Sequence, residues 1–95
     1  MPLVTVPYSI VPKAVEFSHE HADAISKWVL ARETARTIHI DLSHATSATT
    51  AAFATLVVLR RRLLREGRDP RVSGLRERAQ HVFQLNRLQS VLPAN

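Results

Sequence analysis

The sequence predicts an α/β fold: a single domain over residues 1–95, with a mixed four- to five-stranded sheet and three to four helices. The first observation is that apolar residues alternate in some segments and recur at helical spacing in others, in the order β-β-α-β-α-β-α. The second is that 95 residues with a 45% hydrophobic fraction suit one hydrophobic core. Strands that alternate with helices indicate a largely parallel sheet joined by right-handed crossovers.

The first half of the chain is predicted to hold three strands and one helix. Val4–Val11 is rich in β-branched residues, and Pro7 places this strand at an edge or a bulge. Lys13–Ser18 is expected to form a second strand, His21–Glu33 a short amphipathic helix, and Thr37–Leu42 a strand packed on the core. The residues expected in the core here are Phe17, Ala22, Ile25, Trp28, Val29, Leu30, Ile38, Ile40 and Leu42.

A second helix is predicted to follow a run of small polar residues. Ser43–Thr50 ends the preceding strand, and Thr49 or Thr50 is suited to cap a helix that runs to about Arg65. Gly67 stands where a left-handed residue commonly terminates a helix. The expected buried stripe consists of Ala52, Leu56, Leu59 and Leu63, widened by Phe53, Val57 and Leu64.

The last part of the chain is predicted to add one strand and one helix. Asp69-Pro70 is typical of a turn, Arg71–Leu75 is expected to be a short strand, and Arg76–Asn86 a third helix. The apolar residues expected to be buried there are Ala79, Val82, Phe83 and Leu85 or Asn86, with Leu88, Val91 and Leu92 closing the chain.

Composition excludes several kinds of chemistry. The absence of cysteine excludes disulfides, cysteine-based zinc sites, iron–sulfur clusters and thiol nucleophiles. The two glycines, Gly67 and Gly74, fit neither a dinucleotide-binding fingerprint nor a P-loop. Ala45–Leu59, the longest uncharged stretch after the N-terminal segment, is shorter than the roughly 20 residues that a membrane span needs. We therefore expect no membrane insertion and a cytoplasmic location.

The positive charge lies in the second half of the chain. Residues 1–48 carry a net charge of −1 and residues 49–95 a net charge of +6, most of it between Arg60 and Arg78. A basic stripe of this kind can bind nucleic acid, but single-strand binding needs interleaved aromatic residues. No aromatic residue lies between Phe53 and Phe83. We interpret the stripe as a solvated helix face, and a nucleic-acid partner is not expected.

Candidate catalytic and metal-binding residues are few. His19, Glu20, His21 and Asp23 include metal-ligating types, but a turn and helix cap is the commoner role for such a cluster. His39 and Asp41 alternate with core residues on a strand, and we assign His39 to the other face of the sheet. The Ser/Thr run contains no nucleophile elbow of the GxSxG type. We expect no enzymatic activity, no metal and no cofactor.

The stretch from residue 38 to residue 93 resembles the STAS domain. This family includes bacterial anti-sigma-factor antagonists and the cytoplasmic tails of sulfate transporters. Upstream, Phe17–Asp23 resembles a worn form of the Gly-Glu-Leu-Asp turn of the family, with Glu20 matching. The resemblance implies a single STAS-like domain in which Asp41 is structural. The segments that carry it are IHIDLS at Ile38–Ser43, LRRRLLREG at Leu59–Gly67, the RVSGL strand, and LNRLQSVLP at Leu85–Pro93.

The functional segment of the family departs from its usual pattern here. Asp-Ser-Ser-Gly falls on Thr49, Thr50, Ala51 and Ala52, and the phosphorylated second serine corresponds to Ala51. Ala51 has no hydroxyl, so we expect no phosphorylation there, and Thr50 is the alternative acceptor. Some members carry Asp-Thr-Gly-Gly, notably the small STAS subunit of the bacterial phospholipid-transport ABC system, and Thr50 matches their threonine.

The resemblance implies a regulatory module that docks on a protein partner at the start of the second helix. The partner would be an anti-sigma factor kinase, as for an anti-anti-sigma factor, or a transporter ATPase subunit. A helix start presents unpaired N–H groups and a positive dipole end, so a phosphate there would change the docking surface strongly. The alternative is a small-ligand or nucleotide sensor that uses the strand-end crevice of the sheet. The predicted contact residues are Ser47, Thr49, Thr50, Ala51, Ala52, Arg60 and Arg61.

Overall fold

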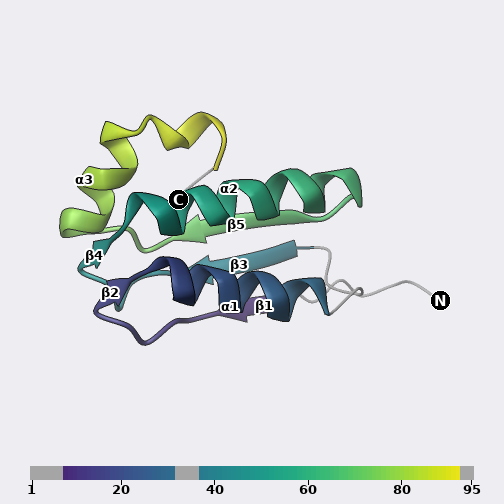
Figure 1. Cartoon of the computed structure of the whole chain (residues 1–95), viewed down its shortest axis with the longest axis horizontal. Coiled ribbons are helices and arrows are strands. Elements are labelled where there is room, and N and C mark those ends of the chain that lie inside the picture. Colours follow the sequence, from purple (N-terminus) through teal and green to yellow (C-terminus); the bar gives the residue numbers. More distant parts are fainter. Residues whose placement is uncertain (1–7, 32–36, 93–95) are drawn as a thin grey trace.

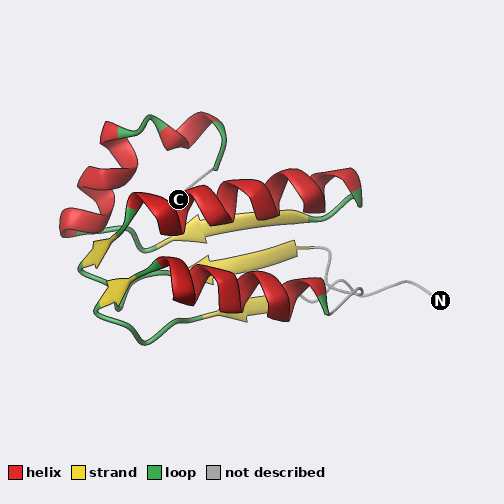
Figure 2. Ribbon diagram, viewed as in Figure 1, coloured by secondary structure: helices red, strands yellow, loops and turns green. Residues whose placement is uncertain are grey.

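Parallel strands build the sheets of the protein, as Figures 1 and 2 show. The computed structural model describes residues 8–31 and 37–92. Within them, β1 (Tyr8–Ile10), β3 (Thr37–Asp41) and β5 (Asp69–Ser73) form one sheet in the order β1-β3-β5. A second sheet consists of two short strands, β2 (Glu16–Phe17) and β4 (Ser47–Ala48). Every pairing among the described strands is parallel, which confirms the α/β class. The prediction of one mixed sheet is wrong for these residues, because the five strands are divided between two parallel sheets.

Two long helices lie side by side over one face of the three-stranded sheet (Figure 1). They are α1 (His19–Leu30), which lies between β1 and β3 in the chain, and α2 (Thr50–Arg65), which lies between β3 and β5. α3 (Glu77–Leu85) lies beside β4 at one end of the molecule, and the short 3₁₀ helix η1 (Leu88–Ser90) follows it. β4, which leads into α2, therefore lies between β2 and α3.

The hydrophobic core lies between the sheet and the two long helices. Ile38 and Ile40 on β3 and Val72 on β5 point to the helices and are at most 1% exposed. The predicted stripe of α2 is confirmed, because its four members are at most 3% exposed, and Phe53 is fully buried with it. The other fully buried members of this core are Phe17, Ala22, Leu42 and Ala79, with Ile25, Val29, Ala45, Ala48, Phe83 and Leu92 nearly so.

The ends of the first helix differ from the prediction. α1 begins at His19 rather than His21, because Ser18 adopts an extended backbone and serves as the N-cap. The Nδ1 atom of His21 accepts a hydrogen bond from the backbone N–H of Ser18 at 3.1 Å. This is the reciprocal half of a capping box, in which histidine takes the place of the usual Glu or Gln. The predicted end at Glu33 lies outside the described residues.

The predicted turn at Asp69-Pro70 is wrong, since both residues belong to β5. The backbone N–H of Leu42, the residue after β3, donates a hydrogen bond to the carbonyl of Ser73 at 2.9 Å. The backbone N–H and C=O groups of Ser73 therefore point toward β3. In a parallel ladder the orientation alternates, and the nitrogen of Pro70 therefore points to the outer edge, where proline is tolerated. The chain turns instead at Gly67, which has the predicted left-handed backbone with a φ of 71°.

Smaller corrections concern segment ends and exposed leucines. The second predicted strand is confined to Glu16–Phe17, and the predicted loop Ser43–Thr50 contains β4. Leu85 is 67% exposed and Leu64 is 44% exposed, so neither joins the core as predicted. Leu85 is the last residue of α3. The structure describes the first predicted strand, Val4–Val11, only from Tyr8, since residues 4–7 lie outside the described residues. Its strand β1 ends at Ile10, one residue before the predicted end.

Candidate functional site

The start of α2 is held between β2 and α3. On the β2 side, the carbonyl of Val15 accepts hydrogen bonds from the backbone N–H groups of Thr46 at 2.9 Å and Ser47 at 3.2 Å. On the α3 side, the carbonyl of Thr46 accepts from the N–H groups of Arg78 at 3.1 Å and Ala79 at 3.3 Å. Two of the N–H groups that the first turn of α3 leaves unpaired are satisfied in this way. The loop that enters α2 is thus fixed on both sides.

Thr49 caps the helix, and it is one of the two cap candidates, Thr49 and Thr50, that the sequence offers. Its Oγ1 atom accepts a hydrogen bond from the backbone N–H of Ala52 at 3.1 Å, and its own N–H donates to the carbonyl of Phe17 at 3.0 Å. The first turn of α2 contains no acidic residue. The positive end of the helix dipole is therefore met by the neutral hydroxyl of Thr49 and by no charge of α2 itself.

The predicted contact residues differ in how accessible they are. Thr50 and Ala51 are exposed, whereas Ser47 and Thr49 are half-buried. Ala52 is fully buried, so it packs in the core and offers no surface to a partner. We call the exposed pair Thr50 and Ala51 the docking end.

The two predicted arginines lie farther along α2. Arg60 is half-buried, and its Nη1 donates to the carbonyl of Val91 at 3.2 Å, which ties the C-terminal segment to the helix. Arg61 is exposed. At 1.5 Å per residue, Arg61 lies about 15 Å from Ala51 along the helix axis. The structure therefore brings Thr50 and Ala51 together and leaves Arg61 at a distance from them.

A polar link between α1 and α2 lies next to the docking end, and no pattern in the sequence indicates it. The hydroxyl of Thr55 donates to the carbonyl of Ala51 at 3.0 Å and lies 2.9 Å from Nδ1 of His19. His19 thus pairs with a neighbouring helix, while His21 belongs to the α1 cap. Within residues 8–31 and 37–92, no three His, Asp or Glu side chains gather closely enough to hold a metal ion.

Asp41 and His39 make structural contacts at the end of β3. Asp41 Oδ1 accepts a hydrogen bond from the backbone N–H of Ser43 at 2.9 Å, and Nε2 of His39 is hydrogen-bonded to Oγ of Ser73 on β5. Hydrogen bonds from the backbone N–H and the hydroxyl of Ser43 lower the pKa of Asp41; desolvation opposes them, and the nearby His39 and His44 add smaller lowering contributions. Both side chains are engaged with neighbouring polar groups of the fold.

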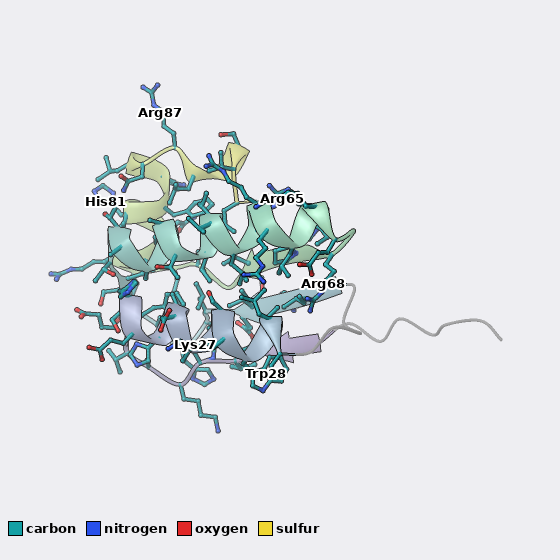
Figure 3. The ribbon with its side chains drawn as sticks, turned by 45° about the vertical axis from the view of Figure 1, so that its right-hand side comes forward. Lys27, Trp28, Arg65, Arg68, His81 and Arg87 are labelled. Atoms are coloured by element: carbon teal, nitrogen blue, oxygen red, sulfur yellow. The ribbon has the colours of Figure 1, made fainter. Side chains whose placement is uncertain are left out.

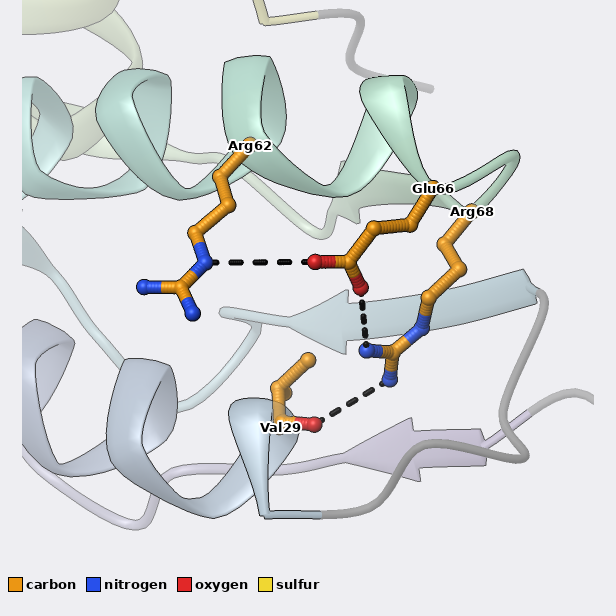
Figure 4. Close-up of polar contacts among 4 residues, drawn as sticks. All are labelled: Val29, Arg62, Glu66 and Arg68. Carbon is orange, nitrogen blue, oxygen red and sulfur yellow. Dashed lines mark hydrogen bonds and ion pairs between the residues drawn. The ribbon is translucent and has the colours of Figure 1, made fainter.

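A buried arginine that the sequence analysis did not single out lies at the other end of the molecule. Arg68 is 3% exposed, and its Nη2 donates to the carbonyl of Val29 in the last turn of α1 at 3.1 Å (Figure 4). Its Nη1 lies 3.4 Å from Glu66 Oε1. Figure 3 shows Arg68 and His81 at opposite ends of the molecule. Arg68 therefore fixes the fold away from the docking end.

Comparisons with known proteins bear on the fold. Among the helices of the described residues, none is long and apolar enough to cross a membrane. No protein-family model matches the sequence, and a comparison with curated proteins finds no significant match. The chain is similar to a crystal structure from Thermotoga maritima described as a "putative anti-sigma factor antagonist", with 18% sequence identity and a TM-score of 0.71. The similarity covers 90% of this chain and 77% of the other, and it confirms the STAS-like fold.

Proposed function

We propose that the protein is a non-enzymatic regulatory module that docks on a protein partner through the docking end, in the manner of an anti-sigma factor antagonist. The observation that carries the proposal is the exposure of Thr50 and Ala51 on a rigidly held helix start, within a fold similar to that of the Thermotoga protein. The small side chains of these residues allow the backbone of a partner to approach closely. The partner would be an anti-sigma factor kinase.

The docking end would remain in one electrostatic state. In the register of the resemblance to the STAS family, Ala51 corresponds to the phosphorylated serine, and alanine accepts no phosphoryl group. A phosphate there would bring about −1.5 to −2 charges to the surface. Without it, binding would depend on the amount of the protein or of its partner rather than on a phosphorylation switch.

Binding to anti-sigma factor kinases of the source organism tests the proposal. Thr50→Asp should leave the fold intact, because an acid in the first turn suits the helix dipole and adds a few tenths of a kcal/mol. The same substitution should weaken partner binding, because the new charge would be buried unpaired at the interface. Gln84→Asp on the exposed surface of α3 is the matched control and should leave affinity unchanged. Equal affinity of the Thr50→Asp variant and the unmodified protein would contradict docking at this end.

Intact-mass analysis after incubation with the same kinase and ATP tests the absence of a switch. We expect no mass increase of one phosphate. A stoichiometric phosphate that Thr50→Val abolishes would show that the acceptor has moved from Ala51 to Thr50.

The exposed hydroxyl of Thr50 favours one second candidate, a STAS subunit of a phospholipid-transport ABC system. In that case the same docking end would bind the ATPase subunit. Co-purification with a candidate ATPase subunit, weakened by Thr50→Asp and not by Gln84→Asp, would support it. Failure of the ATPase to bind, with kinase binding intact, would exclude it.

A further inference from the structure

A groove of about 360 Å³ runs between α1 and α2 on the outer side of the core, to which its lining residue Leu59 belongs. Leu30 and Leu59 lie along its floor, and Ala54 and Val58 of α2 form one wall. Ala54 is exposed, and Val58 is 66% exposed although it is apolar. The groove therefore presents unpartnered apolar surface along two adjacent helices.

The hydroxyl groups beside the groove are satisfied within the protein. Ser26 Oγ donates to the carbonyl of Ala22 at 2.9 Å, and Thr55 Oγ1 donates to that of Ala51 at 3.0 Å. The carboxylate of Asp23 is paired with Lys27 at 3.1 Å. The groove offers few free polar groups to orient a nucleotide or another polar small molecule, so its chemistry favours an apolar occupant.

On α2 the lining of the groove begins at Ala54, three residues beyond Ala51 of the docking end. Ala51, Ala54 and Val58 are spaced three and four residues apart, so they follow one face of the helix. From Ala54 to Arg62 the groove spans eight residues, about 12 Å, which is two turns of a helix. A surface of this length, formed by two helices, matches the way amphipathic helices bind in grooves through anchors three or four residues apart.

The charge of α2 indicates the sign of the charge that its partner carries. α2 carries four arginines and no acidic residue. Arg62, on the rim of the groove, keeps 60% of its side chain exposed, and its Nε lies 3.9 Å from Glu66. Arg65, one turn farther, is also exposed. An occupant with acidic residues at this end would therefore be attracted.

We propose that the groove binds an amphipathic, acidic helix of the protein partner. Two apolar residues of that helix, three or four apart, would cover Ala54 and Val58, and an acidic residue one turn beyond would meet Arg62. A second copy of this chain is disfavoured as the occupant, because its α2 would bring four more arginines to the same surface. The inference rests on the proposed function, since it assumes a protein partner, and it adds a second contact area beyond the docking end.

Selection from a displayed library of helical peptides tests the inference. Peptides of about 12–15 residues suffice to form a marginal helix. Selection on the full chain should enrich acidic peptides with apolar residues three or four apart. Val58→Glu should lower their affinity by at least about tenfold, since it places a like charge on the apolar anchor site. Arg62→Glu should shift the enriched set from acidic to basic peptides.

Leu85→Glu on α3 is the matched control, because Leu85 is 67% exposed and Val58 is 66% exposed. This variant should keep the affinity of the unmodified chain, and circular dichroism should show that both variants fold.

The inference is overturned by enriched peptides without the acidic amphipathic pattern, by equal binding to the Val58→Glu variant, or by no enrichment. Self-association in ultracentrifugation that Val58→Glu abolishes would assign the groove to a second copy, and binding of a fluorescent fatty acid there would assign it to a lipid. Thr50 lies outside the groove. If Thr50→Asp leaves partner binding unchanged, docking through Thr50 and Ala51 is contradicted, while the peptide selection still tests the groove.

Discussion

The ionisation of Asp41, at the end of β3, makes the stability of the fold depend on pH. Hydrogen bonds from Ser43 hold its folded-state pKa below the ordinary value of about 3.9. When folding lowers the pKa of a carboxyl group, its ionised form adds to the free energy of unfolding. This contribution is complete at pH values above the pKa in the unfolded chain, and it is lost as the pH falls through the pKa in the folded protein. Asp41 therefore stabilises the fold at neutral pH and stops doing so in acid.

Asp41→Asn tests this coupling at the residue scale. We expect the variant to be less stable than the unmodified protein at neutral pH, and the difference to shrink as the pH falls below about 3.9. Urea unfolding of both proteins across this range measures it. Asp23→Asn removes an exposed ion pair instead and should show little difference at any pH. A constant difference between the unmodified protein and Asp41→Asn would show that the charge of Asp41 does not contribute.

Gly74 is required where β5 meets the loop after β3. Its φ is 75°, and a Cβ there would lie 2.7 Å from both Asp41 Oδ1 and the backbone nitrogen of Ser43. Gly74→Ala should lower the free energy of unfolding by about 2 kcal/mol or more, from left-handed strain of about 1–2 kcal/mol plus displacement of the Asp41 hydrogen bond. Gly67→Ala has a similar φ of 71° at an exposed site and should show the strain alone. Equal losses for the two variants would mean that the close approach at Gly74 is relieved without cost.

At the scale of the elements, α2 depends on its cap. Thr49→Ala removes the acceptor for the N–H of Ala52 and should cost about 1 kcal/mol of unfolding free energy. Thr50→Ala, one residue into the helix at an exposed position, should cost less than about 0.5 kcal/mol. Chemical denaturation measures both. A reversed order would place the cap at Thr50 in solution.

The buried face of α2 contributes more than its cap. Leu56 is 1% exposed, so Leu56→Ala should lower the unfolding free energy by about 2–5 kcal/mol. Leu64→Ala makes the same chemical change on the same helix at a residue that is 44% exposed, and its cost should be much smaller. A loss below about 0.5 kcal/mol for Leu56→Ala would mean that a different face of α2 is buried in solution.

A helix or strand is predictable from the sequence when the residues that determine it lie close together in the chain. Helix α2 was predicted with its bounds, because its apolar stripe, Thr49 cap and Gly67 terminator are all local features. Strand β4 was missed because it is two residues long and exists only by pairing with β2. The sequence indicates a turn at Pro70, because proline fits β5 only if its nitrogen points away from β3. The direction of that nitrogen depends on how β5 pairs with β3, which no local pattern shows.

The candidate site was predictable to a similar extent. The cap at Thr49 follows from local sequence, and the structure confirms it. The burial of Ala52 follows from the helical stripe already predicted, although the family register placed it in the contact set. The bond between His19 and Thr55 joins residues 36 positions apart, so no local pattern could have indicated it. Contacts between elements are therefore the part that required the structure.

For the molecule as a whole, Arg68 joins the end of α1 to the segment that enters β5. Its guanidinium meets the carbonyl of Val29, where the negative end of the α1 dipole favours a cation. Arg68→Met should lower the unfolding free energy by about 1.5–3 kcal/mol, the usual range for hydrogen bonds of a charged group. Arg65→Met on the exposed surface should change it by less than about 0.5 kcal/mol. Thermal melts at matched salt compare the two, and equal stability of both variants would contradict a linking role for Arg68.

The place of Pro70 on β5 affects how the molecules behave toward each other at high concentration. An edge strand with free N–H groups is a template on which another chain can extend the sheet, and this is one route to aggregation. Pro70, the second of the five residues of β5, is almost fully buried and removes one outward donor from that edge, and the exposed charge of Arg71 follows it directly. A strand from another molecule would have to leave one of its carbonyl groups unpaired at Pro70. The edge is thereby protected against intermolecular sheet growth.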